Sequence, residues 1–364
     1  MRLLRADDFY FPEKVRFINS RIRQGEAITD ATIEWAERIG IFPPNPASRQ
    51  HFRAIACGAF ASLGWPDASP EYLQIISDAV CAAFVIDDIC DGDVACDIHS
   101  DIHPELSGSP QVFDRIATFW SSGDPRLLRR DLPLHIAFRH LRNRVLRCGV
   151  SRSWVDRFAE SFHGWLAGID AELQHKRLRE IPPPDDLMEI RPLSGAAFVF
   201  MHFIELARGI ELSDKALSHE GIIELNRLAS RMAIYPNEVW SYKKESEHGH
   251  AINLVASLMH HRGMPLPEAT AAVAEMHNVD MLRFCEIAQS TMASPLADAS
   301  WQSYVTGLHH FIHGLFVWGW HAQRYSKDFF HAETVPTSHR ATISHQRLRT
   351  FPAMLLDFSG QKKR

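Results

Sequence analysis

Three aspartates, Asp87, Asp88 and Asp91, interrupt a stretch of chain that otherwise has the pattern of a buried helix face. Apolar residues precede them at spacings of three and four, from Leu73 to Phe84, and the same stripe continues to Asp87 and Asp91. Carboxylates on an apolar wall are costly to keep charged, so they must hold a cation, border water or have raised pKa values. A hard divalent metal ion is the simplest of these explanations.

A second apolar stripe, from Ile222 to Ala233, ends in the same way. Continuing its face in steps of four gives Asn237, Ser241 and Glu245. All three side chains are oxygen donors, which suit Mg²⁺ or Mn²⁺, and the absence of His and Cys argues against zinc. We expect the two oxygen-rich faces to meet across one cavity.

These two segments resemble the paired motifs of class I terpene synthases. Asp-Asp-Ile-Cys-Asp at 87–91 resembles the aspartate-rich DDxxD motif, and Asn-Glu-Val-Trp-Ser-Tyr-Lys-Lys-Glu at 237–245 resembles the NSE triad. Arg191 occupies the position of that family's diphosphate-sensing arginine, and Ser194 and Gly195 fall on its linker and effector positions.

The resemblance extends towards the C-terminus and covers roughly residues 50 to 330. Trp318, followed by Arg324 and Tyr325, is similar to the family's tryptophan and terminal Arg-Tyr pair. Pro192, directly after the sensor position, departs from the usual pattern. The resemblance implies a microbial enzyme with a helical bundle around a central cavity, which ionises and cyclises a prenyl diphosphate with three Mg²⁺ ions.

Each candidate residue has an expected role in this chemistry. Asp87 is expected to ligate metal directly, with Asp88 and Asp91 completing or orienting that site, while Asn237, Ser241 and Glu245 hold a further ion. Cationic and hydroxyl groups would bind the diphosphate through hydrogen bonds, and the faces of aromatic rings would stabilise the carbocation. The diphosphate residues are Arg191, Lys244, Arg324 and Tyr325, and the aromatic residues are Phe84, Phe200 and Trp318, for which ordinary core packing is the alternative.

The chain length of the substrate is only weakly indicated. Ala83 and Gly195 are small residues at positions expected to face the pocket, which leaves room for a twenty-carbon chain. We expect farnesyl diphosphate, with geranylgeranyl diphosphate as the alternative.

Composition and periodicity predict one all-α domain spanning residues 1–364. The chain has 364 residues, 46% of them hydrophobic, and three-and-four periodicity dominates while strand signals are sparse. We expect about a dozen helices in a core at about 28–330, and a tail at about 333–364 that closes as a lid or stays loose. No signal peptide or membrane span is evident, so a cytoplasmic protein with reduced cysteines is expected, and a homodimer remains open.

Other functions fit the sequence less well. Cys90, Cys96, His99 and His103 match no common zinc spacing. The arginine-rich stretch at 126–147 could suggest nucleic acid, but the net charge of −5 favours a salt-bridged helix face. A prenyl-chain elongating synthase would carry a second aspartate-rich motif, and a non-catalytic helical binding protein would be expected to lack part of the motif set.

The stripe pattern predicts different effects for two nearby aspartates. Asp87→Asn should reduce turnover about a hundredfold, because removing one metal-anchoring charge costs about 3 kcal/mol of transition-state stabilisation. Asp97→Asn, which is off the stripe, should have little effect. Steady-state kinetics of both purified variants provide the measurement, and equal activities would contradict the assignment.

Overall fold

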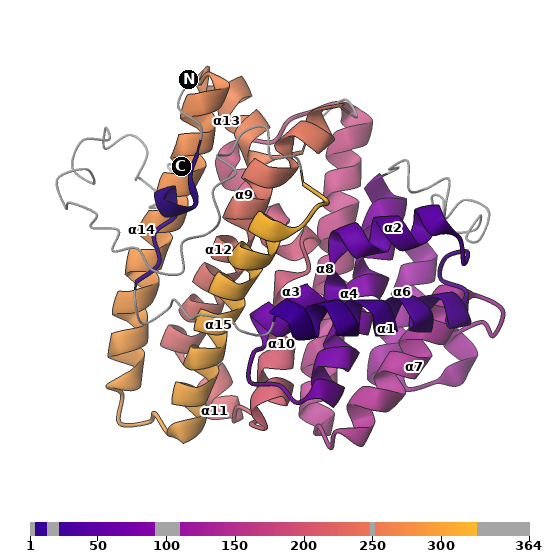
Figure 1. Cartoon of the computed structure of the whole chain (residues 1–364). Helices are drawn as coiled ribbons and strands as arrows, with labels where there is room; N and C mark the ends of the chain where they lie inside the picture. Colours follow the sequence, from indigo (N-terminus) through magenta and orange to yellow (C-terminus); the bar gives the residue numbers. More distant parts are fainter. Residues whose placement is uncertain (1–3, 13–21, 92–109, 248–251, 326–364) are drawn as a thin grey trace.

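The computed structural model describes residues 4–12, 22–91, 110–247 and 252–325, and this part of the chain is helical and contains no β-strand (Figure 1). The helices are α1 (Ile22–Ile39), α2 (Pro46–Ile55), α3 (Cys57–Gly64), α4 (Pro70–Asp91), α6 (Pro110–Ser122), α7 (Pro133–Arg147), α8 (Arg152–Leu178), α9 (Pro184–Ser194), α10 (Ala197–Arg208), α11 (Asp214–Leu217), α12 (Glu220–Glu247), α13 (Leu254–Arg262), α14 (Leu266–Met292) and α15 (Ala299–His321), with 3-10 turns at Ala6–Asp8 and Pro125–Leu127. The predicted all-α class is confirmed.

Helix α4 brings the aspartate motif to the centre of the bundle. The hydroxyl of Ser69 accepts a hydrogen bond from the Tyr72 N–H at 3.3 Å, which satisfies one of the unpaired donors at the start of the helix. Leu73 and Val80 of the predicted stripe are fully buried. The end of this stripe therefore brings Asp87 out of the apolar core, where its side chain is 44% exposed.

Helix α12 carries the second motif without interruption. Pro236 has no N–H for the carbonyl of Met232, yet the helix runs from Glu220 to Glu247 through this position. α12 packs along α14 and α15 on one side of the molecule (Figure 1). This packing is what keeps the helix continuous despite the missing hydrogen bond.

Close backbone contact joins α3 to α15. A Cβ atom at Gly314 of α15 would lie 2.0 Å from the carbonyl oxygen of Leu63 in α3, so only glycine permits this approach. Phe60 and Trp318, from the same two helices, consequently have ring centroids 4.9 Å apart in a T-shaped arrangement.

The helical conformation is interrupted between α9 and α10, where the predicted sensor region lies. Pro192 is buried inside α9, which ends two residues later, and Ala196 has a left-handed φ of 56° before α10 begins. A Cβ at Gly195 would meet the Ile234 side chain at 2.4 Å, so glycine lets the break pack against α12. In the described residues no single helix is long and apolar enough to cross a membrane; only this pair, bent by 45°, meets the length and composition requirement.

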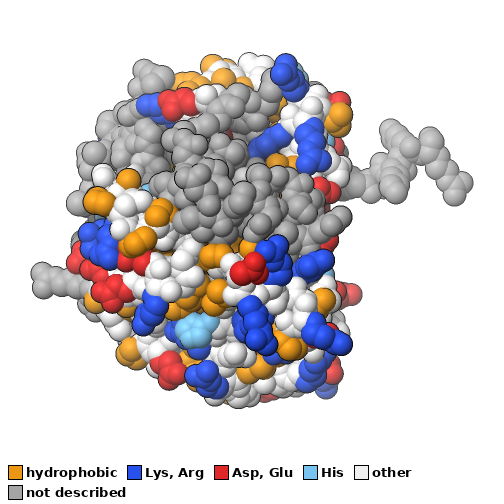
Figure 2. Space-filling model, turned by 90° about the vertical axis from the view of Figure 1, so that its right-hand side faces the viewer, with side chains coloured by type: hydrophobic (Ala, Val, Ile, Leu, Met, Phe, Trp, Pro, Cys, Tyr) orange, Lys and Arg blue, Asp and Glu red, His pale blue; other side chains and the backbone are white. Residues whose placement is uncertain are grey.

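The arginines at 126–147 bond mainly within the chain. Arg126 pairs with Asp124 at 2.7 Å and Arg129 with Asp131 at 2.6 Å, while Arg144 pairs with the buried Asp78. On the face shown in Figure 2, acidic and apolar side chains lie among the visible Lys and Arg side chains. The cysteines that the structure describes, at 57, 81, 148 and 285, are free thiols, as predicted.

Several expectations concern residues outside the described part of the chain. These are Cys96, Asp97, His99, His103 and the tail at about 333–364. For Cys90 and Asp91 the helix is described but the side chains are not.

Candidate active site

A cavity of about 590 Å³ lies among α3, α4, α8, α9, α10, α12 and α15. The predicted site residues that line it are Ala83, Phe84, Asp87, Arg191, Gly195, Phe200, Asn237, Ser241, Lys244, Glu245, Trp318, Arg324 and Tyr325. Both oxygen-rich faces thus border one space. Asp88 does not line it.

The two adjacent aspartates of the motif have different environments. The Asp87 side chain is 44% exposed at the cavity, whereas that of Asp88 is fully buried and accepts hydrogen bonds from Arg324 at 2.7 Å and His51 at 3.0 Å. Burial alone would raise the pKa of Asp88, but Arg324 and His51 outweigh it, so the pKa is lowered and the carboxylate stays charged. Neighbouring helix positions point about 100° apart, so the Asp88 side chain lies against Arg324 and His51 while that of Asp87 borders the cavity.

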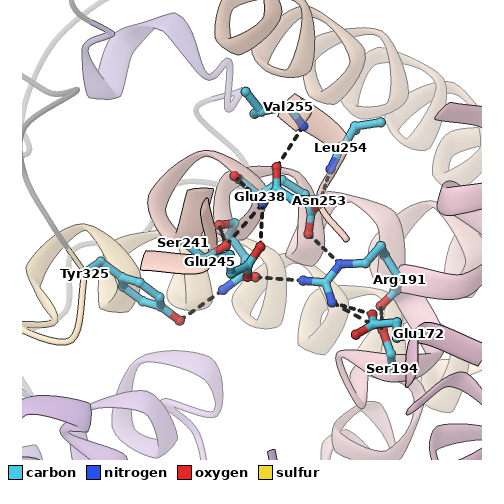
Figure 3. Close-up of polar contacts among 11 residues, drawn as sticks. Glu172, Arg191, Ser194, Glu238, Ser241, Glu245, Asn253, Leu254, Val255 and Tyr325 are labelled. Carbon is cyan, nitrogen blue, oxygen red and sulfur yellow. Dashed lines mark hydrogen bonds and ion pairs between the residues drawn. The ribbon is translucent and has the colours of Figure 1, made fainter. Parts of the chain in front are cut away.

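Asn253 holds two of the three oxygen donors of α12, Ser241 and Glu245. Its side-chain amide donates to Glu245 at 2.9 Å and to the Ser241 hydroxyl at 3.4 Å. The Ser241 hydroxyl itself donates to the backbone carbonyl of Asn237 at 2.8 Å. Ser241 and Glu245 lie one helical turn apart, so their side chains point the same way, and both accept hydrogen bonds from Asn253 (Figure 3).

This donor set fits a hard divalent cation. In the described part of the chain no three His, Cys, Asp or Glu side chains converge closely enough to hold a metal by themselves. The donors are instead carboxylate, amide and hydroxyl oxygens from Asp87 on one wall and from Asn237, Ser241 and Glu245 on the other. Oxygen-only donors on two walls suit Mg²⁺, which completes its coordination with water and substrate phosphate.

Arg191 is buried between two carboxylates. Its guanidinium pairs with Glu172 of α8 at 2.6 Å and with Glu238 of α12 at 2.7 Å, and it donates to the Asn237 side-chain oxygen at 3.3 Å (Figure 3). Burial would lower the pKa of Arg191, but the two carboxylates raise it, so the cation persists. Its acidic partners lie on other helices and are neither Asp186 nor Glu189, the neighbours that sequence proximity suggests.

The linker position, Ser194, joins this network. The Ser194 hydroxyl bonds to Glu172, and the Ser194 backbone carbonyl accepts a hydrogen bond from the Trp165 indole at 2.9 Å. The C-terminal end of α9 is therefore bound to α8 through Glu172, which also pairs with Arg191.

The segment after α15 closes the opposite side of the cavity. The Tyr325 hydroxyl accepts a hydrogen bond from the Asn237 side-chain amide at 3.0 Å, and burial raises the pKa of Tyr325, so its phenol is neutral. The Arg324 guanidinium carbon lies 4.9 Å from the centroid of the Phe84 ring. The terminal Arg-Tyr pair thus contacts both the α4 and the α12 walls.

Aromatic rings form the apolar part of the cavity. Trp318 lies 5.9 Å from Phe84 and 4.9 Å from Phe60, measured between ring centroids, and Phe60 lies 5.6 Å from Phe200. Phe60 was not predicted from sequence, and neither were Trp240 and Phe311, which also line the cavity.

Sequence reasoning also missed one face of α8 and its C-cap. Trp165, Glu172, Lys176 and Arg179 all line the cavity at helical spacing, so this face changes from aromatic to acidic to basic. The same kind of change marked the stripes of α4 and α12, and it could have identified α8 as a third wall.

Comparison with known proteins agrees with this architecture. A family model described as "Terpene synthase family 2, C-terminal metal binding" matches residues 78–283. The chain belongs to the terpene synthase family. Its relatives include the (+)-T-muurolol synthase ((2E,6E)-farnesyl diphosphate cyclizing) of Roseiflexus castenholzii, 27% identical over 83% of this chain and 89% of the relative, and the 10-epi-cubebol synthase of Sorangium cellulosum, 24% identical over 84% and 94%.

Solved structures show the same fold. The germacradien-4-ol synthase of Streptomyces citricolor superposes with a TM-score of 0.70 at 20% identity, covering 87% of this chain and 99% of that one. The linalool/nerolidol synthase of Streptomyces clavuligerus gives 0.68 at 20% identity over 83% and 96%. This terpene synthase therefore has the class I fold, and the family assigns it a divalent metal and a prenyl diphosphate substrate.

The position of Arg191 predicts a strong response to a conservative change. Arg191→Lys should lower kcat/KM at least about tenfold and weaken inhibition by inorganic diphosphate, because lysine cannot reproduce the forked contacts of the guanidinium. Arg53→Lys is the control, since Arg53 forms an exposed ion pair with Asp30, a kind of pair worth about 0–1 kcal/mol. Melting temperatures should accompany the kinetics. Unchanged inhibition and kinetics in the Arg191 variant would assign the residue a purely structural role.

Proposed function

We propose that this terpene synthase converts farnesyl diphosphate to a cyclic sesquiterpene and releases diphosphate in an Mg²⁺-dependent reaction. The observation that carries the proposal is a single cavity with oxygen donors and cations at one end and aromatic rings at the other. A prenyl diphosphate has the same division between an anionic head and an apolar chain. The farnesyl specificity named for the Roseiflexus relative supports the fifteen-carbon substrate.

The polar end would bind and orient the diphosphate. Arg191, Lys244 and Arg324 would contact its oxygens with charge-assisted hydrogen bonds, and the neutral Tyr325 hydroxyl would donate a further one. Asp87 on one wall and the α12 donors on the other would hold Mg²⁺, for which we expect three ions. When bound, Mg²⁺ supplies positive charge that neutralises the leaving diphosphate.

Ionisation breaks the bond between carbon and the diphosphate oxygen, and the electron pair leaves with the oxygen. The allylic cation that remains needs a wall that stabilises positive charge without attacking it. Phe84, Phe200 and Trp318 would do this with their ring faces, each contributing roughly 0.5–2 kcal/mol. Rings that exclude water also delay quenching of the cation, which gives the chain time to cyclise.

A twenty-carbon substrate is the second candidate. Ala83 lines the cavity one helical turn before Asp87, and a small side chain there leaves depth for a longer chain. Geranylgeranyl diphosphate is therefore the alternative substrate for the same chemistry.

Incubation with defined substrates tests the proposal directly. The purified protein with Mg²⁺ should release diphosphate and form a cyclic hydrocarbon or alcohol from farnesyl diphosphate faster than from geranyl or geranylgeranyl diphosphate. Gas chromatography with mass spectrometry and a diphosphate-release assay provide the readouts. EDTA should abolish turnover because all the proposed ligands are hard oxygen donors. Rescue by zinc alone, or a faster reaction with geranylgeranyl diphosphate, would refute the metal or the substrate assignment respectively.

Ala83→Phe tests whether this wall sets the usable depth of the cavity. The larger ring should shift the preference towards shorter diphosphates or give less cyclised products, because it fills space that a folded chain needs. Overpacking could itself destabilise the fold by about 1–3 kcal/mol, so the melting temperature must be measured alongside. A folded variant with unchanged products and rates would remove the argument for a twenty-carbon substrate.

A further inference from the structure

Helix α2 lies outside the sequence motifs and before the region matched by the family model, yet it contacts both sides of the polar end of the cavity. The carbonyl of Ala54 accepts a hydrogen bond from the Arg324 backbone N–H at 3.2 Å, and that of Ile55 accepts one from the Trp318 indole at 2.8 Å. The last carbonyls of a helix have no partners within it, so these are available to hold another segment. The end of α2 thus anchors the chain that carries Arg324.

A side chain of α2 holds the opposing carboxylate. His51 bonds to one oxygen of Asp88 at 3.0 Å, and Arg324 bonds to the other at 2.7 Å. The Arg324 guanidinium is also 3.4 Å from Asp87. Because Asp88 is fully buried, the orientation of its carboxylate depends on these contacts, and the direction in which Arg324 points depends on Asp88.

We propose that His51 is a positioning residue for diphosphate binding. It holds the Asp88 oxygen that Arg324 does not contact, and the guanidinium is thereby kept at the cavity, near the Phe84 ring and Asp87. This inference rests on the proposed role of Arg324 as a diphosphate ligand. It is independent of the chain length of the substrate, since the hydrogen bond from His51 to Asp88 is at the polar end.

Substitution at His51 separates positioning from packing. His51→Leu introduces an apolar side chain of similar size that cannot bond to Asp88, whereas His51→Gln places an amide N–H near the position of the histidine Nε2. His51→Leu should weaken binding of inorganic diphosphate, measured by calorimetry with Mg²⁺ present, by about tenfold, as expected for losing one hydrogen bond to a charged group. KM should rise by a similar factor, and His51→Gln should recover most of the loss.

A double-variant cycle tests whether His51 acts through Asp88. If it does, adding His51→Leu to Asp88→Asn should cause little further loss of diphosphate affinity, because the two substitutions disrupt one interaction. Arg53→Leu is the matched control, since Arg53 lies on the same helix and forms an exposed ion pair with Asp30. This control should bind diphosphate like the unaltered protein.

Three results would overturn the proposal: unchanged diphosphate affinity in His51→Leu, losses that add fully to those of Asp88→Asn, or a lowered melting temperature with no recovery in His51→Gln. The calorimetric measurement needs no turnover. If no prenyl diphosphate is converted but the His51 effects appear as described, the proposed reaction fails while the positioning role stands.

Discussion

One buried guanidinium determines how the polar end of this helical bundle is built. Arg191 of α9 pairs with Glu172 of α8 and with Glu238 of α12, so a single cation joins α12 to two helices that precede it in the sequence. Removing one partner from such a buried pair typically costs about 3–5 kcal/mol, because the remaining charge is left unpaired. The three helices therefore keep one relative position, and the cavity between them is defined by it.

The opposite side of the cavity follows the same principle with the charges reversed. There the buried anion is Asp88, and it is satisfied by Arg324 from the segment after α15 and by His51 from α2. The Tyr325 hydroxyl and the Asn237 amide join the two sides. Groups that could bind a diphosphate are thus already held by protein partners, which limits their reorganisation when the substrate arrives.

The apolar end depends on close packing rather than on charge. Gly314 allows a backbone approach between α15 and α3 that no Cβ would tolerate, and this approach brings the walls that carry Phe60 and Trp318 together. The cavity can consequently be both dry and preformed. These properties suit the chemistry of a terpene synthase, because a carbocation survives only where water is excluded and aromatic faces are near.

The sequence by itself determined the class of fold and the positions at which apolar helix faces become polar. Helical periodicity is a local property, so the spacing of residues along the chain was enough to identify Asp87, Asn237 and Glu245 as cavity residues. The same spacing placed Asp87 on the stripe and left Asp88 off it, but it did not show that packing buries Asp88 against Arg324 and His51. Only the tertiary structure decided that His51, Glu172 and Phe60 belong to the site, since each acts through partners on another helix, and contacts between helices depend on how the whole bundle packs.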